Sequence, residues 1–231
     1  MGSPIAENLA RVLDRIRAAE LEAGLPQGSV ALVGVTKNRT VAEVEEAVRA
    51  GLTDIGENRL QEAAEKLPRL TTPATRHFIG HLQRNKAARV LGLFEMIQSL
   101  DSERLARALD RHAGDAGVRV KTLVQVNTSG ESTKFGVEPD ACDSLLEVVS
   151  GLEHLDVLGL MTIGPLTGDQ AGIIKSFKLL RGLFERYAAG PPGNCRMEVL
   201  SMGMSADFET AIAEGSNMVR VGTAIFGSCG F

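Results

Sequence analysis

The stretch VALVGVTKNRTVAEVEEAVRA, residues 30–50, contains one complete unit of the fold. Its first part, VALVGV (30–35), is apolar and rich in β-branched residues, which is typical of a strand buried on both faces. Residues 40–50 place their apolar positions at helical spacing, with Thr40 suited to cap the start and Gly51 to end the helix. A strand followed by such a helix predicts a parallel βα unit.

The same unit recurs along the whole chain. We predict strands at 30–35, 52–56, 77–80, 94–100, 120–127, 155–163, 197–203 and 218–226. We predict the intervening helices at 40–50, 59–67, 82–91, 102–113, 138–149, 169–188 and 205–214. Eight such strands predict a (β/α)8 TIM barrel, for which about 250 residues is typical. A doubly wound open sheet is the alternative.

An additional amphipathic helix is predicted at residues 5–23, ahead of the first strand. The chain ends before an eighth following helix can form, so we expect the N-terminal helix to fill that place in the outer ring. Residues 1–231 are therefore expected to form a single barrel domain. A closed barrel exposes no strand edge for pairing, which favours a monomer.

Composition excludes several classes of protein. The chain carries 29 acidic and 25 basic residues, a net charge of -4, whereas a nucleic-acid binder is expected to be basic. No apolar run approaches the roughly 18 residues of a membrane helix, and the charged N-terminus does not resemble a signal peptide. Cys142, Cys195 and Cys229 are scattered, which argues against a disulfide framework or a thiolate metal site. A cytoplasmic protein that binds neither nucleic acid nor membrane is expected.

In a (β/α)8 barrel the active site lies at the carboxyl ends of the strands. Lys37 follows the first predicted strand directly. Apolar surroundings there would disfavour its ammonium form and leave an amine able to form a Schiff base with an aldehyde. On position alone, a lysine that extends to solvent remains the alternative.

The loops after the last two predicted strands are suited to bind an anion. MGMSADFE (202–209) is expected to begin a helix capped by Ser205, and VRVGTA (219–224) supplies Gly222 and the Thr223 hydroxyl. A phosphate site at this place is recurrent in barrels, although two ordinary strand exits would look similar. A lysine and a phosphate site together fit a phosphorylated aldehyde, of which pyridoxal 5'-phosphate (PLP) is the obvious candidate. A phosphosugar aldolase is the competing interpretation.

His77 and His81 are four residues apart but do not predict a metal site. In an extended strand this separation places them roughly 13 Å apart, too far to share a metal. We expect His77 to pack inside the barrel and His81 to line the pocket.

Six stretches at these strand ends resemble those of one family, the pyridoxal phosphate homeostasis proteins of the YggS/PROSC type. They are VGVTKNRT (33–40), DIGENRLQEA (54–63), HFIGHLQRNK (77–86), VNTSGESTKFGV (126–137), GLMTIGP (159–165) and LSMGMSADFETAIAEGSNMVRVGTAIFG (200–227). They occur in order from the first strand to the last, so the resemblance covers nearly the whole chain. It implies a barrel similar to that of alanine racemase, without the second β-domain of that enzyme.

The resemblance also implies a set of ligand-binding residues. Lys37 falls on the lysine that carries PLP as a Schiff base, and Arg220 on the arginine facing the pyridine nitrogen. Lys134 matches a second lysine implicated in handling PLP. The other positions bind the phosphate (Ser205, Gly222, Thr223) or line the ligand (Asn58, His81, Met161, Ser201).

The function implied by the resemblance is to carry or buffer PLP in vitamin B6 homeostasis, without robust catalysis. PLP-dependent apo-enzymes are the expected recipients. A weak PLP-dependent amino-acid racemase is the alternative. That reaction normally needs a second base, which similar racemases bring as a tyrosine from their other domain, whereas Tyr187 lies on a predicted outer helix. Arg220 can only donate hydrogen bonds and would favour an unprotonated ring nitrogen, a poor electron sink.

Overall fold

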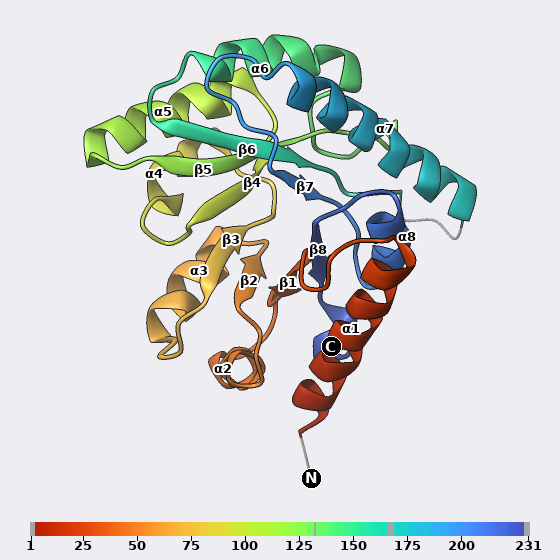
Figure 1. Ribbon diagram of the computed structural model, residues 1–231. Helices are drawn as coiled ribbons and strands as arrows, with labels where there is room; N and C mark the ends of the chain where they lie inside the picture. The colour runs from red at the N-terminus through yellow and green to blue at the C-terminus, as the bar shows by residue number, and fades with distance from the viewer. Residues whose placement is uncertain (1–2, 132, 166–168, 229–231) are drawn as a thin grey trace.

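The structure is a computed structural model and describes residues 3–131, 133–165 and 169–228. Its eight parallel strands form a closed barrel in chain order, and the last strand pairs with the first through Gly34 and Val221 (Figure 1). The predicted (β/α)8 barrel is confirmed, and the open sheet is wrong. Across the described part of the chain, no helix is both long and apolar enough to cross a membrane.

The strands are short, as expected for a barrel of this size. They are β1 (Ala31–Val35), β2 (Asp54–Glu57), β3 (Thr75–Phe78), β4 (Met96–Leu100), β5 (Val120–Gln125), β6 (Leu155–Met161), β7 (Val199–Ser201) and β8 (Met218–Val221). The α-helices are α1 (Pro4–Glu22), α2 (Val41–Arg49), α3 (Leu60–Lys66), α4 (Ala87–Val90), α5 (Glu103–Ala116), α6 (Cys142–Ser150), α7 (Gln170–Ala189), α8 (Phe208–Ala213) and α9 (Thr223–Phe226). Three 3-10 turns lie at Leu67–Arg69, Arg84–Lys86 and Pro139–Ala141.

Helix α1 occupies the place predicted for it beside β1 and β8 (Figure 1). It buries Leu9, Val12 and Ile16 in a cluster that also contains apolar residues of α8 and α9. Glu20 is fully buried near its C-terminus and accepts a hydrogen bond from the backbone nitrogen of Val30 at 2.8 Å. The buried carboxylate therefore fixes the end of α1 to the start of β1.

The last predicted strand is wrong in its second half. Residues 218–226 were predicted as one strand, but β8 ends at Val221 and α9 follows. The hydroxyl of Ser205 accepts hydrogen bonds from the backbone nitrogens of Gly222 and Ala224. These two N–H groups therefore do not join the sheet ladder, and the chain turns into a short helix instead.

Several predicted helices are also shorter than expected, and two of them differ in how they begin. The segment 82–91 divides into a 3-10 turn and the four residues of α4. The predicted helix over 205–214 begins only at Phe208, because residues 205–207 form a turn. In that turn, the carboxylate of Asp207 accepts a hydrogen bond from the backbone nitrogen of Met204 at 2.5 Å.

The barrel interior is partly apolar and partly polar. Met96, Leu123, Leu158 and Met161 form a small buried cluster that is separate from the two outer clusters between strands and helices. Polar side chains from opposite strands also meet inside, since Ser201 on β7 bonds to Gln98 on β4. The interior is therefore filled by side chains, as in other barrels of this size.

Candidate functional site

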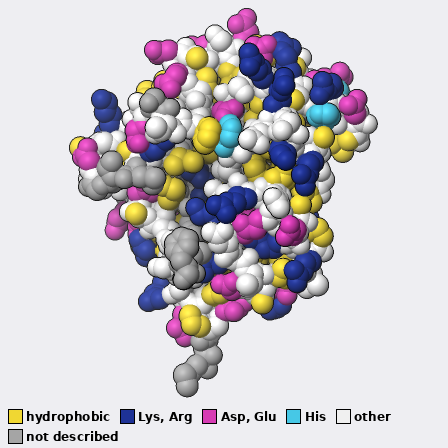
Figure 2. Space-filling view, turned by 180° about the vertical axis from the view of Figure 1, so that it is seen from behind, with side chains coloured by type: hydrophobic (Ala, Val, Ile, Leu, Met, Phe, Trp, Pro, Cys, Tyr) yellow, Lys and Arg dark blue, Asp and Glu magenta, His cyan; other side chains and the backbone are white. Residues whose placement is uncertain are grey.

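The predicted ligand-binding residues all lie on or just after strand ends at the carboxyl face of the barrel. The parallel register places these ends at one rim: Val35 is opposite Gly56, and Met161 is opposite Ser201. On the face shown in Figure 2, Lys and Arg side chains gather beside a hollow, with a histidine close by. The barrel topology thus brings residues from both halves of the chain together at its mouth.

Lys37 lies in the turn that follows β1, and its side chain is exposed. The apolar enclosure expected from the sequence is therefore wrong, because the chain has already left the strand when it reaches Lys37. The turn itself is well anchored. Asn38 has a positive φ of 58°, and its backbone nitrogen donates to Glu62 Oε1 at 2.6 Å.

The buried side chain of Lys66 anchors the turn that contains Lys37. The Lys66 side chain is only 6% exposed, and its ammonium donates to the backbone oxygens of Thr36 at 2.7 Å and Arg39 at 3.2 Å, on either side of Lys37. The Lys66 nitrogen also lies 2.7 Å from Glu57 Oε1. A buried cation therefore fixes the backbone that presents Lys37.

Glu57 completes this anchor. Burial raises the pKa of its carboxyl, opposed by hydrogen bonds from Lys66 and from the Thr36 hydroxyl, which donates to Glu57 Oε1 at 2.5 Å. We did not predict the role of Lys66 or Glu57. The sequence feature that could have indicated Lys66 is its spacing from Glu62. The two residues are four apart on one helix, and they form an ion pair at 2.8 Å.

Asn58 and His81 lie side by side at the rim. Gly80 permits this, because a Cβ atom there would lie 2.0 Å from the Asn58 backbone oxygen. The His81 ring stacks on Phe135 with a centroid separation of 3.8 Å, and its Nδ1 lies 3.1 Å from Asp101 Oδ2. Asn58 and His81 line a hollow of about 370 Å³ whose lining includes none of the other predicted ligand-binding residues. Asn58 Oδ1 is buried and has no hydrogen-bond partner among the described residues, so it can accept from a ligand.

Arg220 projects into the barrel interior below the rim. Its guanidinium donates to Ser201 Oγ at 2.5 Å and to the Thr162 backbone oxygen at 2.6 Å. Burial lowers the pKa of Arg220 to about 10, and nearby Asp207 opposes this change, so the side chain stays charged at neutral pH. Met161, also predicted to line the ligand, is fully buried in the interior apolar cluster.

The predicted phosphate-binding residues come together, although not in the way expected. Ser205 does not cap α8; Asp207 precedes that helix, and its carboxylate already accepts from Met204. Ser205 Oγ instead accepts from Gly222 N at 3.2 Å. Ser205 is therefore in direct contact with the start of α9, next to the exposed Thr223 side chain.

Lys134 lies on the other side of the mouth, in the loop after β5. Its side chain is 15% exposed and its nitrogen donates to the Gly164 backbone oxygen at 3.0 Å and pairs with Glu131 at 2.8 Å. These contacts join the loops after β5 and β6.

Other candidate groups lie away from the mouth. His77 is buried inside the barrel, as predicted, and its Nε2 lies 2.9 Å from Asp54. Burial raises the pKa values of the Cys142 and Cys195 thiols to about 11 each; Cys229 lies outside the described residues.

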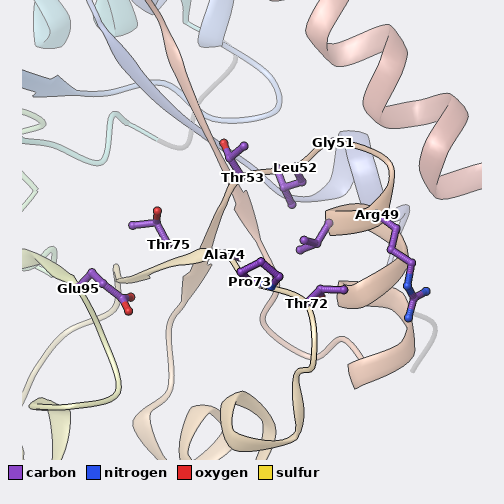
Figure 3. A pocket seen from close by; sticks show the side chains of 10 residues that line it. Arg49, Gly51, Leu52, Thr53, Thr72, Pro73, Ala74, Thr75 and Glu95 are labelled. Atoms are coloured by element: carbon purple, nitrogen blue, oxygen red, sulfur yellow. The ribbon is translucent and has the colours of Figure 1, made fainter.

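A hollow of about 600 Å³ opens at the opposite end of the barrel, between the helix α2 region and β3 (Figure 3). It contains none of the predicted ligand-binding residues.

Comparison with known proteins places this barrel in a class. Residues 8–229 match the family model "Alanine racemase, N-terminal domain". An alanine racemase of Clostridium difficile superposes with a TM-score of 0.71 at 17% identity, covering 97% of this chain and 57% of the racemase. At that identity the likeness concerns the fold alone. The molecule is therefore an alanine-racemase-type barrel.

Closer relatives define the family. The chain is 40% identical over 227 residues to the pyridoxal phosphate homeostasis protein of Pseudomonas aeruginosa, covering 98% of this chain and 96% of the relative. The structure of PipY from Synechococcus elongatus with PLP bound superposes with a TM-score of 0.81 at 38% identity, covering 92% of this chain and 99% of PipY. The chain belongs to the pyridoxal phosphate homeostasis protein family.

Proposed function

We propose that this protein binds PLP at the barrel mouth and carries or buffers it, without robust catalysis of its own. The observation that carries this proposal is the arrangement of the mouth. The exposed side chain of Lys37 lies on an anchored turn after β1, and the Ser205 hydroxyl, held by the N–H groups of Gly222 and Ala224, lies at the end of the neighbouring strand β8. The PLP-bound structure of PipY supports the choice of ligand.

Lys37 is proposed to hold PLP covalently. Lys37 would supply the amine, once deprotonated, and PLP would supply an electrophilic aldehyde, so that the two could form a Schiff base with loss of water. Because the Lys37 side chain is exposed, ligand can enter and leave without opening the barrel. Because Lys66 fixes the backbone on both sides, Lys37 is presented from a constant position.

The phosphate is proposed to bind at the start of α9. The hydroxyls of Ser205 and Thr223 can donate to phosphate oxygens, and the N–H groups of Gly222 and Ala224 hold the Ser205 oxygen in place. Gly222 allows the chain to pack closely against β1, since a Cβ atom there would lie 3.2 Å from Val35 Cβ. Asn58 Oδ1 offers an acceptor to a ligand donor.

Two features favour a carrier over the racemase alternative. Arg220 would disfavour a proton on the ring nitrogen if it faces that atom, because it is charged and can only donate. Tyr187, the single tyrosine, is buried on α7 and its hydroxyl donates to Asp143 at 2.6 Å, within the outer layer. It therefore cannot serve as a second base at the mouth.

A titration tests the proposal. Purified protein should develop a new absorption band when PLP is added, with a stoichiometry of one, and should release PLP on dilution. Lys37→Ala should lack the band. Failure of the wild-type protein to bind PLP would refute the function. The cytoplasmic location, the monomeric state and PLP-dependent apo-enzymes as recipients remain predictions from the sequence.

A further inference from the structure

A chain of hydrogen-bonded side chains crosses the barrel interior and ends at Arg220. Asp54 Oδ1 lies 2.9 Å from His77 Nε2, and His77 Nδ1 lies 3.1 Å from Gln98 Nε2. Gln98 Oε1 accepts from the Ser201 hydroxyl at 2.7 Å, and Ser201 Oγ accepts from Arg220 Nη1 at 2.5 Å. We call these five residues the core chain.

The core chain is shielded from water along most of its length. His77, Gln98, Ser201 and Arg220 are all buried, and only Asp54, at the opposite end of the barrel, is partly accessible. A polar group in such an interior is strongly disfavoured when it lacks a partner. Each of the three inner members, His77, Gln98 and Ser201, is therefore constrained by the two neighbours with which it is paired.

The direction of every hydrogen bond in the core chain is determined by its two ends. Arg220 can only donate, so Ser201 Oγ accepts and sends its own proton to Gln98 Oε1. The amide of Gln98 is thereby oriented with its NH₂ group toward His77 Nδ1. His77 must then accept at Nδ1 and carry its proton on Nε2, which donates to the Asp54 carboxylate.

The Asp54 end is consistent with this direction. Burial alone would raise the pKa of the Asp54 carboxyl, but hydrogen bonds from His77 and Thr53 outweigh it and hold the pKa below its usual value. Asp54 is therefore an ionised acceptor at neutral pH. An obligatory donor at one end and an acceptor at the other leave a single consistent arrangement of protons.

Reversing the direction of any hydrogen bond in the core chain would weaken the contact that orients the Arg220 guanidinium. If Gln98 turned its amide over, its NH₂ group would face Ser201 Oγ, and the Ser201 proton would lose its acceptor in the core chain. The oxygen that holds Arg220 Nη1 would then no longer be fixed. Among the described residues, the other terminal nitrogen, Nη2, bonds only to the Thr162 backbone oxygen, and that single bond does not fix the direction of the guanidinium by itself.

We propose that Gln98 and His77 are positioning residues of the ligand site, which act through Ser201 to fix the direction of the Arg220 guanidinium. This inference rests on the proposed function, in which Arg220 faces the ring nitrogen of PLP. The core chain thus connects the far end of the barrel to the group that sets the electronic state of the ligand.

Nuclear magnetic resonance of ligand-free protein tests the core chain itself. In the wild-type protein, ¹⁵N shifts should show neutral His77 with its proton on Nε2, and the Arg220 side-chain N–H groups should exchange slowly with water. Gln98→Met removes the amide contacts to His77, Ser201 and the Met218 sulfur at similar size and should accelerate Arg220 exchange about tenfold, the effect of one lost hydrogen bond.

A second substitution separates positioning from packing. Gln98→Glu keeps an acceptor for Ser201, so Arg220 exchange should stay slow, while the new carboxylate facing Nδ1 should make His77 doubly protonated. Ser99→Ala is the control: it is the next residue on β4, and its buried hydroxyl has no partner among the described residues. It should leave both His77 and Arg220 unchanged.

The proposal is wrong if wild-type His77 carries its proton on Nδ1, or if Gln98→Met leaves Arg220 exchange unaltered. The first measurement needs no variant, so it decides the question even if Gln98→Met fails to fold. Spectra of PLP-loaded protein then address the function. The absorption of bound PLP should change in Gln98→Met and be restored in Gln98→Glu. Altered Arg220 exchange with an unaltered PLP spectrum would support the core chain but refute the placement of Arg220 beside PLP.

Discussion

Ser205 Oγ lies 3.2 Å from the backbone nitrogen of Gly222 and accepts its hydrogen bond. This contact joins the turn after β7 to the end of β8. It also ends that strand, because the Gly222 N–H bonds to Ser205 and not to a neighbouring strand. It also fixes the Ser205 hydroxyl at the start of α9, at one point of the mouth. The proposed phosphate site is built on this contact.

Ser205→Ala should weaken PLP binding by about tenfold, because a hydrogen bond to a charged group contributes roughly 1.5–3 kcal/mol. Binding of pyridoxal, which lacks the phosphate, should be weak and unaffected by the substitution. Ser150→Ala is a matched control, since in the described part of the chain that hydroxyl bonds only within α6. Equilibrium dialysis of both compounds measures the effect, and equal affinities for PLP and pyridoxal would exclude a phosphate site.

Lys37 and Lys134 can be distinguished by chemical labelling. Borohydride reduction of PLP-loaded protein should leave the pyridoxyl group on the peptide that contains Lys37, because the Lys134 ammonium is already held by Glu131 and Gly164. Lys37→Ala should lose the label, and Lys134→Ala should retain it. Mass spectrometry of the peptides provides the measurement, and a label found mainly on Lys134 would overturn the assignment.

The barrel could be predicted because strand burial is a local property of the sequence. Runs such as VALVGV are apolar at every position, and the helices between them carry caps and helical spacing. The prediction for the last strand, 218–226, is wrong in its second half for the same reason. VRVGTAIF has the composition of a strand, but the Ser205 hydroxyl, which comes from a distant turn, withdraws two N–H groups from the ladder.

The candidate site could be predicted only where residues follow strand ends. The positions of Lys37, Asn58 and His81 at the mouth follow from topology alone. The groups that support them could not be found in this way, because their partners are far away in the sequence. Gln98 is the clearest case: a single amide within the strand MIQSL carries little meaning until Ser201 is seen 2.7 Å away.

Lys66→Met should destabilise the protein by about 3–5 kcal/mol, the usual consequence of leaving a buried carboxylate without its cation. Arg49→Met is a suitable control, because Arg49 pairs with Glu45 on the surface at the same helical spacing and should contribute no more than about 1 kcal/mol. Urea denaturation provides both values.

The effect of Lys66→Met should depend on pH in a specific direction. Burial already raises the pKa of Glu57, and removal of Lys66 should raise it further. When the pKa of a carboxyl is higher in the folded than in the unfolded protein, its contribution to folding stability is present below the unfolded-state pKa. That contribution is lost as the pH rises through the folded-state pKa. The loss of folding stability caused by Lys66→Met should therefore be small in acid, where Glu57 is protonated in both the folded and the unfolded state. It should be larger at about pH 8. A penalty independent of pH would show that Glu57 is not the group affected.

The sharpest test of the carrier function is hydrogen exchange at the α-carbon of amino acids. Catalysis by PLP needs a ring that accepts electrons and a base on each face of the substrate carbon for racemisation. Here Arg220 donates to its surroundings from a buried site, and Tyr187 is held by Asp143 in the outer layer. PLP-loaded protein incubated with L-alanine in deuterated water should therefore incorporate little deuterium and form little D-alanine. Appreciable exchange that disappears in Lys37→Ala would establish the racemase alternative instead. Exchange that persists in Lys37→Ala would come from free PLP and leave the carrier function unchallenged.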